Sequence, residues 1–136
     1  MSRFNWQDIG QFVAIFIGGA IGGVGRYELS NYLNEFNQFA GTTAVNLIGC
    51  FLMAITIYGI SMRFDLPEWL MLGLGTGVIG GFTTFSALML AFITNYQQHI
   101  IGAFVFLTLN LIGGFLMALF GYLSAKWINR GRGLWS

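Results

Sequence analysis

The densest group of residues with possible chemistry is the run Gly-Thr-Gly-Val-Ile-Gly-Gly-Phe-Thr-Thr-Phe-Ser at positions 75–86, in the middle of a long uncharged stretch. Its adjacent glycines and two β-branched threonines lower the helix propensity there, so we expect a break in the helix. A break frees backbone carbonyls, which can hold a small cation where they are buried or line a cavity. A phenyl ring has a positive edge, so Phe82 or Phe85 can receive an anion if it faces a pore. The whole pattern favours an ion site over an ordinary glycine-rich packing helix.

Three further polar side chains, Arg26, Asn46 and Asn110, fall within apolar stretches. Polar groups inside a membrane are costly, which makes them candidates for function. Each asparagine can donate amide hydrogens to an anion or bond a neighbouring helix. Arg26 can face an aqueous vestibule or pair with another residue. The runs that begin at Asn46 and Asn110 are identical at eight of nine positions, so we place the two asparagines at equivalent depths.

The residues that an enzyme would need are absent from the sequence. The apolar stretches contain no cluster of His, Asp and Glu, and neither G-x-S-x-G nor a phosphate-binding glycine loop occurs. The single cysteine, Cys50, excludes an internal disulfide framework and a cysteine-rich zinc site. We therefore expect that the chain is not an enzyme.

The elements that hold these residues follow from the composition. Of the 136 residues, 56% are hydrophobic and only 8% are charged, against roughly 25% charged in a soluble domain. So few charges cannot cover a water-soluble fold, which excludes a soluble enzyme and a disordered chain. The net charge of +1 gives no footprint for nucleic acid. The chain is predicted to lie in a lipid bilayer.

The positions of the charges divide the chain into membrane spans, each of which needs about 20 residues. We predict an all-α membrane protein, a single four-span domain over residues 1–136, with the third helix broken in mid-span. The spans run from about 9–33, 41–62, 68–94 and 100–127, and the polar patch 95–99 separates the last two. We expect no cleaved signal peptide, because the first apolar stretch exceeds a typical h-region and no A-x-A-like site follows it.

Glycines cluster within the predicted spans as G-x-x-x-G pairs, such as Gly18 and Gly22 in the first and Gly73, Gly77 and Gly81 in the third. Small residues let helix backbones approach closely in lipid. The sequence leaves open whether these glycines serve packing within one bundle or a dimer interface.

The distribution of Lys and Arg predicts a fixed orientation with both termini in the cytoplasm. The loops at 34–40 and 95–99 hold no basic residue, and Arg26 alone can count for their side. The side that the termini and the middle loop share carries five basic residues: Arg3, Arg63, Lys126, Arg130 and Arg132.

Three motifs, at 22–27, 41–49 and 77–86, resemble in this order those of the Fluc (CrcB) family of fluoride-specific ion channels. The resemblance covers essentially the whole chain. It implies a four-helix subunit of an antiparallel, dual-topology-type dimer in the bacterial cytoplasmic (inner) membrane, surrounded by lipid. Such a dimer encloses two pores and a central structural Na+, and its passive efflux of fluoride lowers the cytoplasmic fluoride concentration.

The resemblance also implies roles for individual residues. The backbone oxygens of Gly80 and Thr83 would hold the sodium ion. A bare fluoride ion must exchange its hydration shell for N–H, O–H and aromatic-edge contacts that are weak enough to release it. The ion pathway would contain Asn46, Phe85, Ser86, Asn110 and Arg26.

The chain departs from the family pattern along one pathway. Leu88 replaces the second pore phenylalanine, Ala87 stands where Thr or Ser is usual, and Phe106 and Gly114 replace polar residues of the fourth helix. One ion path is therefore expected to be degraded. An antiparallel homodimer also needs a Lys and Arg bias near zero, which this chain lacks. We predict a heterodimer with a paralogous subunit of opposite topology.

Two other functions stay open on the sequence alone. A non-conducting structural partner within a heterodimeric fluoride channel is consistent with the losses at Leu88, Phe106 and Gly114. A small multidrug transporter, which exchanges organic cations for protons, needs a carboxylate deep in the first helix. The first carboxylate after the start of that apolar stretch is Glu28, near the end of the span.

Overall fold

The computed structural model describes residues 5–37 and 39–130, and every regular element within these ranges is a helix. The first span is α1 (Trp6–Asn34). Asn5 caps it, because its Oδ1 accepts from the Trp6 N–H at 2.8 Å and its own N–H donates to Asp8 Oδ2 at 2.8 Å. This reciprocal pair satisfies backbone donors that a helix start leaves free.

The second and third spans each contain a π-helical segment. The second consists of α2 (Ala40–Ala54), η1 (Ile55–Ile60) and α3 (Ser61–Arg63) in continuous sequence. The third begins after Pro67 with α4 (Glu68–Leu72), η2 (Gly73–Ile79) and α5 (Gly80–Phe82). It resumes as α6 (Phe85–Gln98). The fourth span is α7 (Ile100–Asn129).

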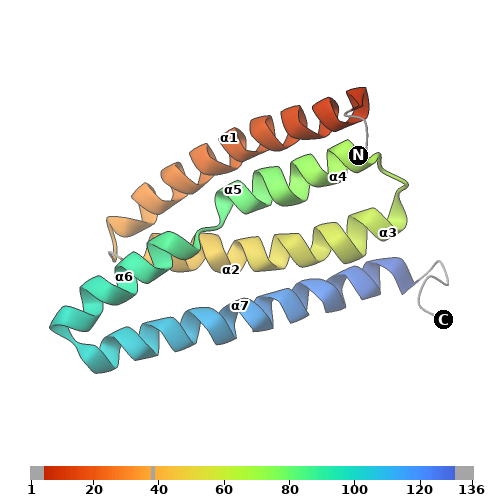
Figure 1. Cartoon of the computed structure of the whole chain (residues 1–136). Helices are drawn as coiled ribbons and strands as arrows, with labels where there is room; N and C mark the ends of the chain where they lie inside the picture. Colours follow the sequence, from red (N-terminus) through yellow and green to blue (C-terminus); the bar gives the residue numbers. More distant parts are fainter. Residues whose placement is uncertain (1–4, 38, 131–136) are drawn as a thin grey trace.

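Four helical stretches are long and apolar enough to cross a membrane: Trp6–Asn34, Ala40–Arg63, Glu68–Gln98 and Ile100–Asn129. The prediction of an all-helical protein with four such helices is therefore confirmed. The stretches lie side by side, and α1 begins at the end of the bundle where α3 meets α4 and α7 ends (Figure 1). Arg63, Lys126 and Arg130 lie at this end by their place in the chain, whereas Arg3 and Arg132 are outside the described residues.

Glycines bring α1 against the first half of the third span, backbone to backbone. A Cβ added at Gly22 would collide with the Val78 carbonyl oxygen, and one at Gly81 would stand 2.6 Å from the Gly19 carbonyl oxygen. Small residues also join α2 to α7, where a Cβ at Gly121 would stand 2.7 Å from the Phe51 carbonyl oxygen. These glycines therefore serve packing within one subunit.

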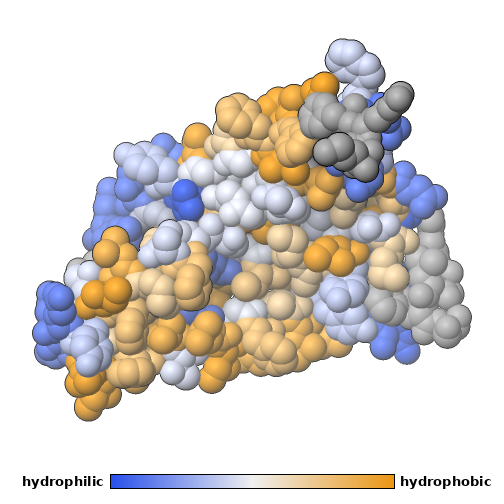
Figure 2. Space-filling view, in the orientation of Figure 1, coloured by the Kyte–Doolittle hydropathy of each residue, from blue (hydrophilic) through white to orange (hydrophobic). Residues whose placement is uncertain are grey.

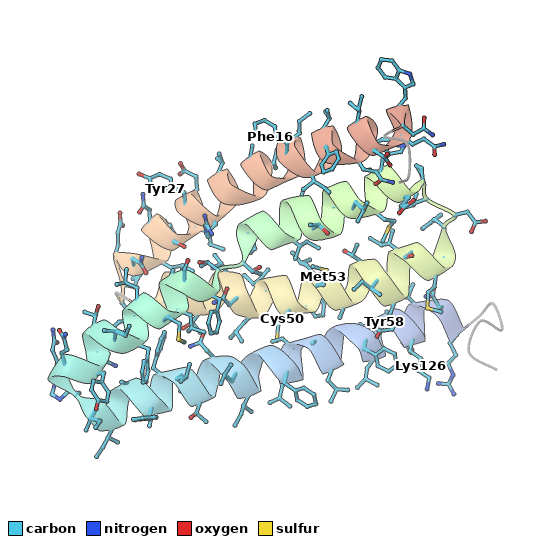
Figure 3. All side chains as sticks on the ribbon, in the orientation of Figure 1. Phe16, Tyr27, Cys50, Met53, Tyr58 and Lys126 are labelled. Atoms are coloured by element: carbon cyan, nitrogen blue, oxygen red, sulfur yellow. The ribbon has the colours of Figure 1, made fainter. Side chains whose placement is uncertain are left out.

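The bundle carries its large apolar side chains on the outside. Phe16 is 78% exposed and points away from the other helices, as does Tyr27 (Figure 3). Apolar residues cover most of the visible face of α7, while hydrophilic residues gather at the two ends of the bundle (Figure 2). Among the described residues, the apolar ones with no exposed surface are Val45, Ala103 and Ala125, and none of them is large. This arrangement suits a bundle whose solvent is lipid.

Candidate functional site

The third span departs from helical geometry at two residues. Thr83 (φ −81°, ψ 157°) and Thr84 (φ −152°, ψ 120°) are extended, and the chain turns there between α5 and α6 (Figure 1). The Thr83 N–H still bonds the Ile79 carbonyl at 3.0 Å. The Thr84 N–H instead donates to Asn46 Oδ1 on α2, so it does not bond the Gly80 carbonyl. The carbonyl of Gly80, an exposed residue, has therefore lost its helical donor.

Asn46 holds this segment by two hydrogen bonds to one residue. Its Oδ1 accepts from the Thr84 N–H at 2.8 Å, and its Nδ2 donates to the Thr84 carbonyl at 2.9 Å. The side chain thus replaces the backbone partners that Thr84 lost when it left the helix. An amide nitrogen carries two hydrogens, so one hydrogen of Asn46 stays available to a ligand.

The residues that follow the turn present donors on the surface of the subunit. Thr84 Oγ1 accepts from the Ala87 N–H at 3.2 Å, which caps α6, and it lies 3.2 Å from Ser86 Oγ. One hydrogen bond between two hydroxyls uses one of their two hydrogens, so the other is free for a ligand. The ring of Phe85 beside them is 67% exposed.

Arg26 on α1 reaches the same two-residue segment. Its Nη1 donates to the Thr83 carbonyl at 3.5 Å, which is long for a hydrogen bond. The half-buried guanidinium therefore places a positive charge beside the turn. Gly49 on α2 is needed here as well, because a Cβ at that position would collide with the Thr83 Cγ2.

Asn110 faces α2 from α7 and is 6% exposed. Its Nδ2 donates to Thr43 Oγ1 at 3.1 Å and to the Phe106 carbonyl at 2.9 Å. Both amide hydrogens are thus used inside the subunit. Its Oδ1 is buried and has no partner among the described residues. Asn110 can offer no hydrogen to an anion while these bonds persist.

A groove of about 370 Å³ brings several of these residues together. Asn46, Thr84, Phe85 and Asn110 contribute to its lining from α2, the break and α7. Cys50, which lies between α2 and α7 (Figure 3), and Gly114 line it too. The arrangement can bind a small anion, since it combines amide, hydroxyl and aromatic-edge donors.

The residues expected to degrade one pathway make apolar contacts. Leu88 is 5% exposed and lines the groove, and a Cβ at Gly114 would stand 3.3 Å from Cys50 Sγ. Phe106 packs against Phe39 with ring centroids 5.2 Å apart. These three positions add no donor to the groove.

Two residues of the site had not been singled out from the sequence. Thr84 donates one hydrogen bond to Asn46 and accepts another from it, and Thr43 accepts one from Asn110. Thr43 lies three residues before Asn46, on the same face of a helix, and that spacing could have identified it.

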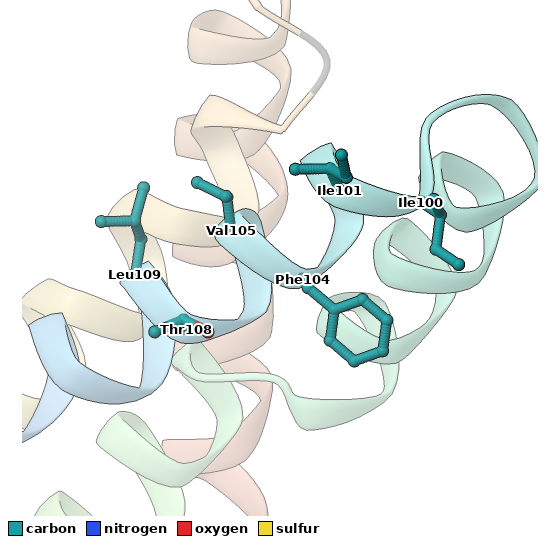
Figure 4. A pocket seen from close by; sticks show the side chains of 6 residues that line it. All are labelled: Ile100, Ile101, Phe104, Val105, Thr108 and Leu109. Atoms are coloured by element: carbon teal, nitrogen blue, oxygen red, sulfur yellow. The ribbon is translucent and has the colours of Figure 1, made fainter.

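A larger hollow lies away from the break, on the surface of α7 (Figure 4). It has a volume of about 530 Å³, and Thr108 is the one polar residue in its lining. Side chains of a single helix form it, among them Ile101, Val105 and Leu109 (Figure 4). Such a surface suits lipid chains rather than an ion.

Comparison with known proteins identifies close relatives. The family model described as CrcB-like protein, Camphor Resistance (CrcB), matches residues 13–122. The chain is 39% identical over 122 residues to Fluoride-specific ion channel FluC 2 of Listeria innocua, with 88% of this chain and 95% of the relative covered. It is 40% identical over 119 residues to FluC 2 of Ligilactobacillus salivarius, with 83% of each covered. It is 35% identical over 116 residues to FluC 1 of Bacillus cereus, with 82% and 84% covered.

Proposed function

The chain belongs to the CrcB family, and on this basis we propose that it is a subunit of a fluoride-specific ion channel through which fluoride leaves the cytoplasm passively. The predicted resemblance is confirmed, and so is the prediction that the chain is not an enzyme, since the relatives are channels. The direction of flow is our proposal. Fluoride that enters a cell as the weak acid HF dissociates inside, so its gradient is directed outward.

The observation that carries the proposal is the extended pair Thr83–Thr84, held in mid-span by Asn46. Fluoride is small and strongly hydrated, so it enters a membrane only where protein donors replace its water. The free amide hydrogen of Asn46, one hydroxyl hydrogen of the Thr84–Ser86 pair and the exposed ring of Phe85, whose edge is positive, are such donors. Arg26 adds a positive charge that favours an anion.

Growth of bacteria that lack their own fluoride channels tests this function. Cells that express the chain, with its paralogue where one is needed, are expected to grow at fluoride concentrations that arrest cells with an empty vector. Asn46→Asp in this chain is expected to abolish the protection. Equal arrest with and without the chain would contradict the proposed function.

We also propose that the channel is an antiparallel dimer. Gly80, Phe85 and Ser86 are exposed in the single subunit, although they lie near the middle of a membrane span. Backbone and hydroxyl groups at that depth cannot face lipid, so a second subunit is needed to cover them. Cross-linking in membranes tests the dimer, and a chain that remains monomeric would contradict it.

A structural Na+ at the centre of that dimer is part of the proposal. Hard cations take oxygen ligands. The Gly80 carbonyl has lost its helical donor, and among residues 5–37 and 39–130 the Thr83 carbonyl has only the long contact with Arg26, so both fit this role. If Na+ bound there, these carbonyl oxygens would hold it, and its positive charge would stabilise the dimer contact. Replacement of Na+ by N-methylglucamine is expected to lower the thermal stability of the purified dimer.

We propose that the partner is a paralogue of opposite topology, in the cytoplasmic membrane, and that both termini of this chain are cytoplasmic. The biased distribution of Lys and Arg supports this, as do the numerals 1 and 2 in the relatives' names. Robust fluoride efflux by the chain alone, reconstituted without a paralogue, would overturn the heterodimer. Reporter fusions at each terminus test the orientation.

A second candidate function is a non-conducting structural subunit of the same channel. The buried Leu88 and the occupied amide hydrogens of Asn110 favour it, because they remove donors from this subunit's side of the groove. Asn46→Asp placed in this chain alone separates the two functions. Unchanged efflux through the heterodimer would support the structural role.

A further inference from the structure

A second polar contact, between Thr43 on α2 and Asn110 on α7, is not among the fluoride contacts proposed above. Thr43 and Asn46 are three residues apart, so their side chains share one face of α2. Thr43 lines a groove of about 600 Å³ with Asn95 and Phe106, whereas Asn46 and Asn110 line the groove at the break. The hydrogen bond from Asn110 to Thr43 therefore lies where these two grooves approach each other.

The direction of this hydrogen bond decides what Thr43 can offer. Asn110 Nδ2 donates to Thr43 Oγ1 at 3.1 Å, so the hydroxyl oxygen is the acceptor. A hydroxyl that accepts from one side still carries its own hydrogen. Among the described residues, Asn110 is the hydrogen-bond partner of this hydroxyl. The hydrogen is thus free for a ligand.

The orientation of Asn110 is fixed by its other contact. The second Nδ2 hydrogen bonds the Phe106 carbonyl at 2.9 Å. A reversed amide would place Oδ1 against that carbonyl oxygen, and two acceptors would then face each other. The observed orientation leaves Oδ1 buried without a partner in the part of the chain that the structure describes, which costs free energy. An asparagine that served packing alone would have no need of such a fixed and costly orientation.

We propose that Thr43 is a further anion contact of the ion path and that Asn110 is a positioning residue that directs the Thr43 hydroxyl hydrogen toward the ion. This inference rests on the proposed fluoride conduction. An anion that leaves Asn46 finds the next donor one helical turn away, roughly 5 Å along α2. A neutral hydroxyl binds an anion weakly enough to release it into the outer groove.

Fluoride efflux from liposomes, measured with a fluoride electrode, tests the role of Thr43. The liposomes contain whichever assembly conducts fluoride as wild type, either the chain alone or the chain with its paralogue. Thr43→Val keeps the shape and removes the hydroxyl, and we expect efflux to fall about tenfold, as for the loss of one hydrogen bond. Thr43→Ser keeps the hydroxyl and is expected to conduct within about twofold of wild type. If Thr43→Val does not fold, Thr43→Ala provides the same comparison.

A double-variant cycle tests the positioning role of Asn110. Asn110→Leu keeps the number and branching of side-chain heavy atoms, removes the amide and is expected to lower efflux about tenfold in the wild-type background. Because Asn110 acts through Thr43, the same change is expected to have no further effect in Thr43→Val. Losses that multiply would overturn the positioning role.

The two proposals fail in different ways. Wild-type efflux through Thr43→Val and Thr43→Ala would overturn the anion contact and leave the proposed function intact. Absence of fluoride efflux from wild type, alone and with its paralogue, would overturn the proposed function and this inference with it.

Discussion

The two halves of the third span are held in different ways. The first half, from Glu68 to Phe82, packs backbone to backbone against α1 through the glycines of both helices. The second half, α6, packs against α7 through aromatic side chains, with the ring of Phe104 5.4 Å from that of Phe92. Backbone contacts between glycines leave no side chain that can adapt, whereas rings can shift. The first half is therefore packed rigidly against α1, whereas the position of the second half depends on the break.

The break lies at the junction of these two halves. Asn46, from α2, bonds both the N–H and the carbonyl of Thr84 and so determines where α6 begins. The proposed donors of Asn46, Thr84, Phe85 and Ser86 all lie at or beside this point. This difference between the two halves predicts which substitutions abolish folding and which only change fluoride efflux.

The largest effect is expected from a substitution in the glycine contact between α1 and the first half of the third span. Gly22→Leu would place a side chain where even a Cβ meets the Val78 carbonyl, so we expect loss of a folded, monodisperse protein. Gly23→Leu is the matched control, because a Cβ at Gly23 meets nothing within 4 Å. Size-exclusion chromatography and thermal unfolding in detergent measure both. Equal stability of the two variants would contradict the role of the glycine contact.

Asn46→Asp is expected to have the next largest effect. It leaves the fold in place but removes the bond to the Thr84 carbonyl and adds a negative charge to the ion path. Two negative charges about 4 Å apart repel each other by about 4 kcal/mol near a protein surface, so fluoride efflux is expected to fall by about a hundredfold or more. Asn31→Asp makes the same change at an exposed position of α1 and is expected to conduct normally. Unchanged efflux in Asn46→Asp would remove Asn46 from the path.

A smaller effect is expected at the N-terminus of α6. Thr84→Ala removes the oxygen that accepts from the Ala87 N–H and caps α6. The loss of such a cap costs about 1 kcal/mol. We expect a lower thermal midpoint and reduced efflux, while Thr84→Ser retains both. A midpoint in Thr84→Ala equal to that of wild type would show that the cap does not hold α6.

The smallest effect is expected within the aromatic contact. Phe104 is 52% exposed, and its ring packs at its edge against Phe92. Phe104→Leu is expected to cost about 1 kcal/mol or less and to change efflux only a few-fold. Loss of folding in this variant would show that the second half is held as rigidly as the first.

The sequence predicted the fold more fully than the contacts. Its charge positions predicted four spans, and the glycines and threonines at 80–84 predicted where helix propensity is lowest. The bonds of Asn46 to Thr84 were not predicted, because they depend on how α2 is rotated against the third span. The use of both Asn110 hydrogens within the subunit was missed for the same reason. The π-helical segments η1 and η2 were also not predicted, because no local sequence pattern indicated them.

The central claim is that fluoride passes where Asn46 holds the broken third span. Ion-selective measurement of efflux from liposomes loaded with equal fluoride and chloride tests it most directly, with the chain alone and with its paralogue. We predict that fluoride leaves while chloride is retained. Release of both anions at the same rate, or of neither in any assembly, would contradict the account.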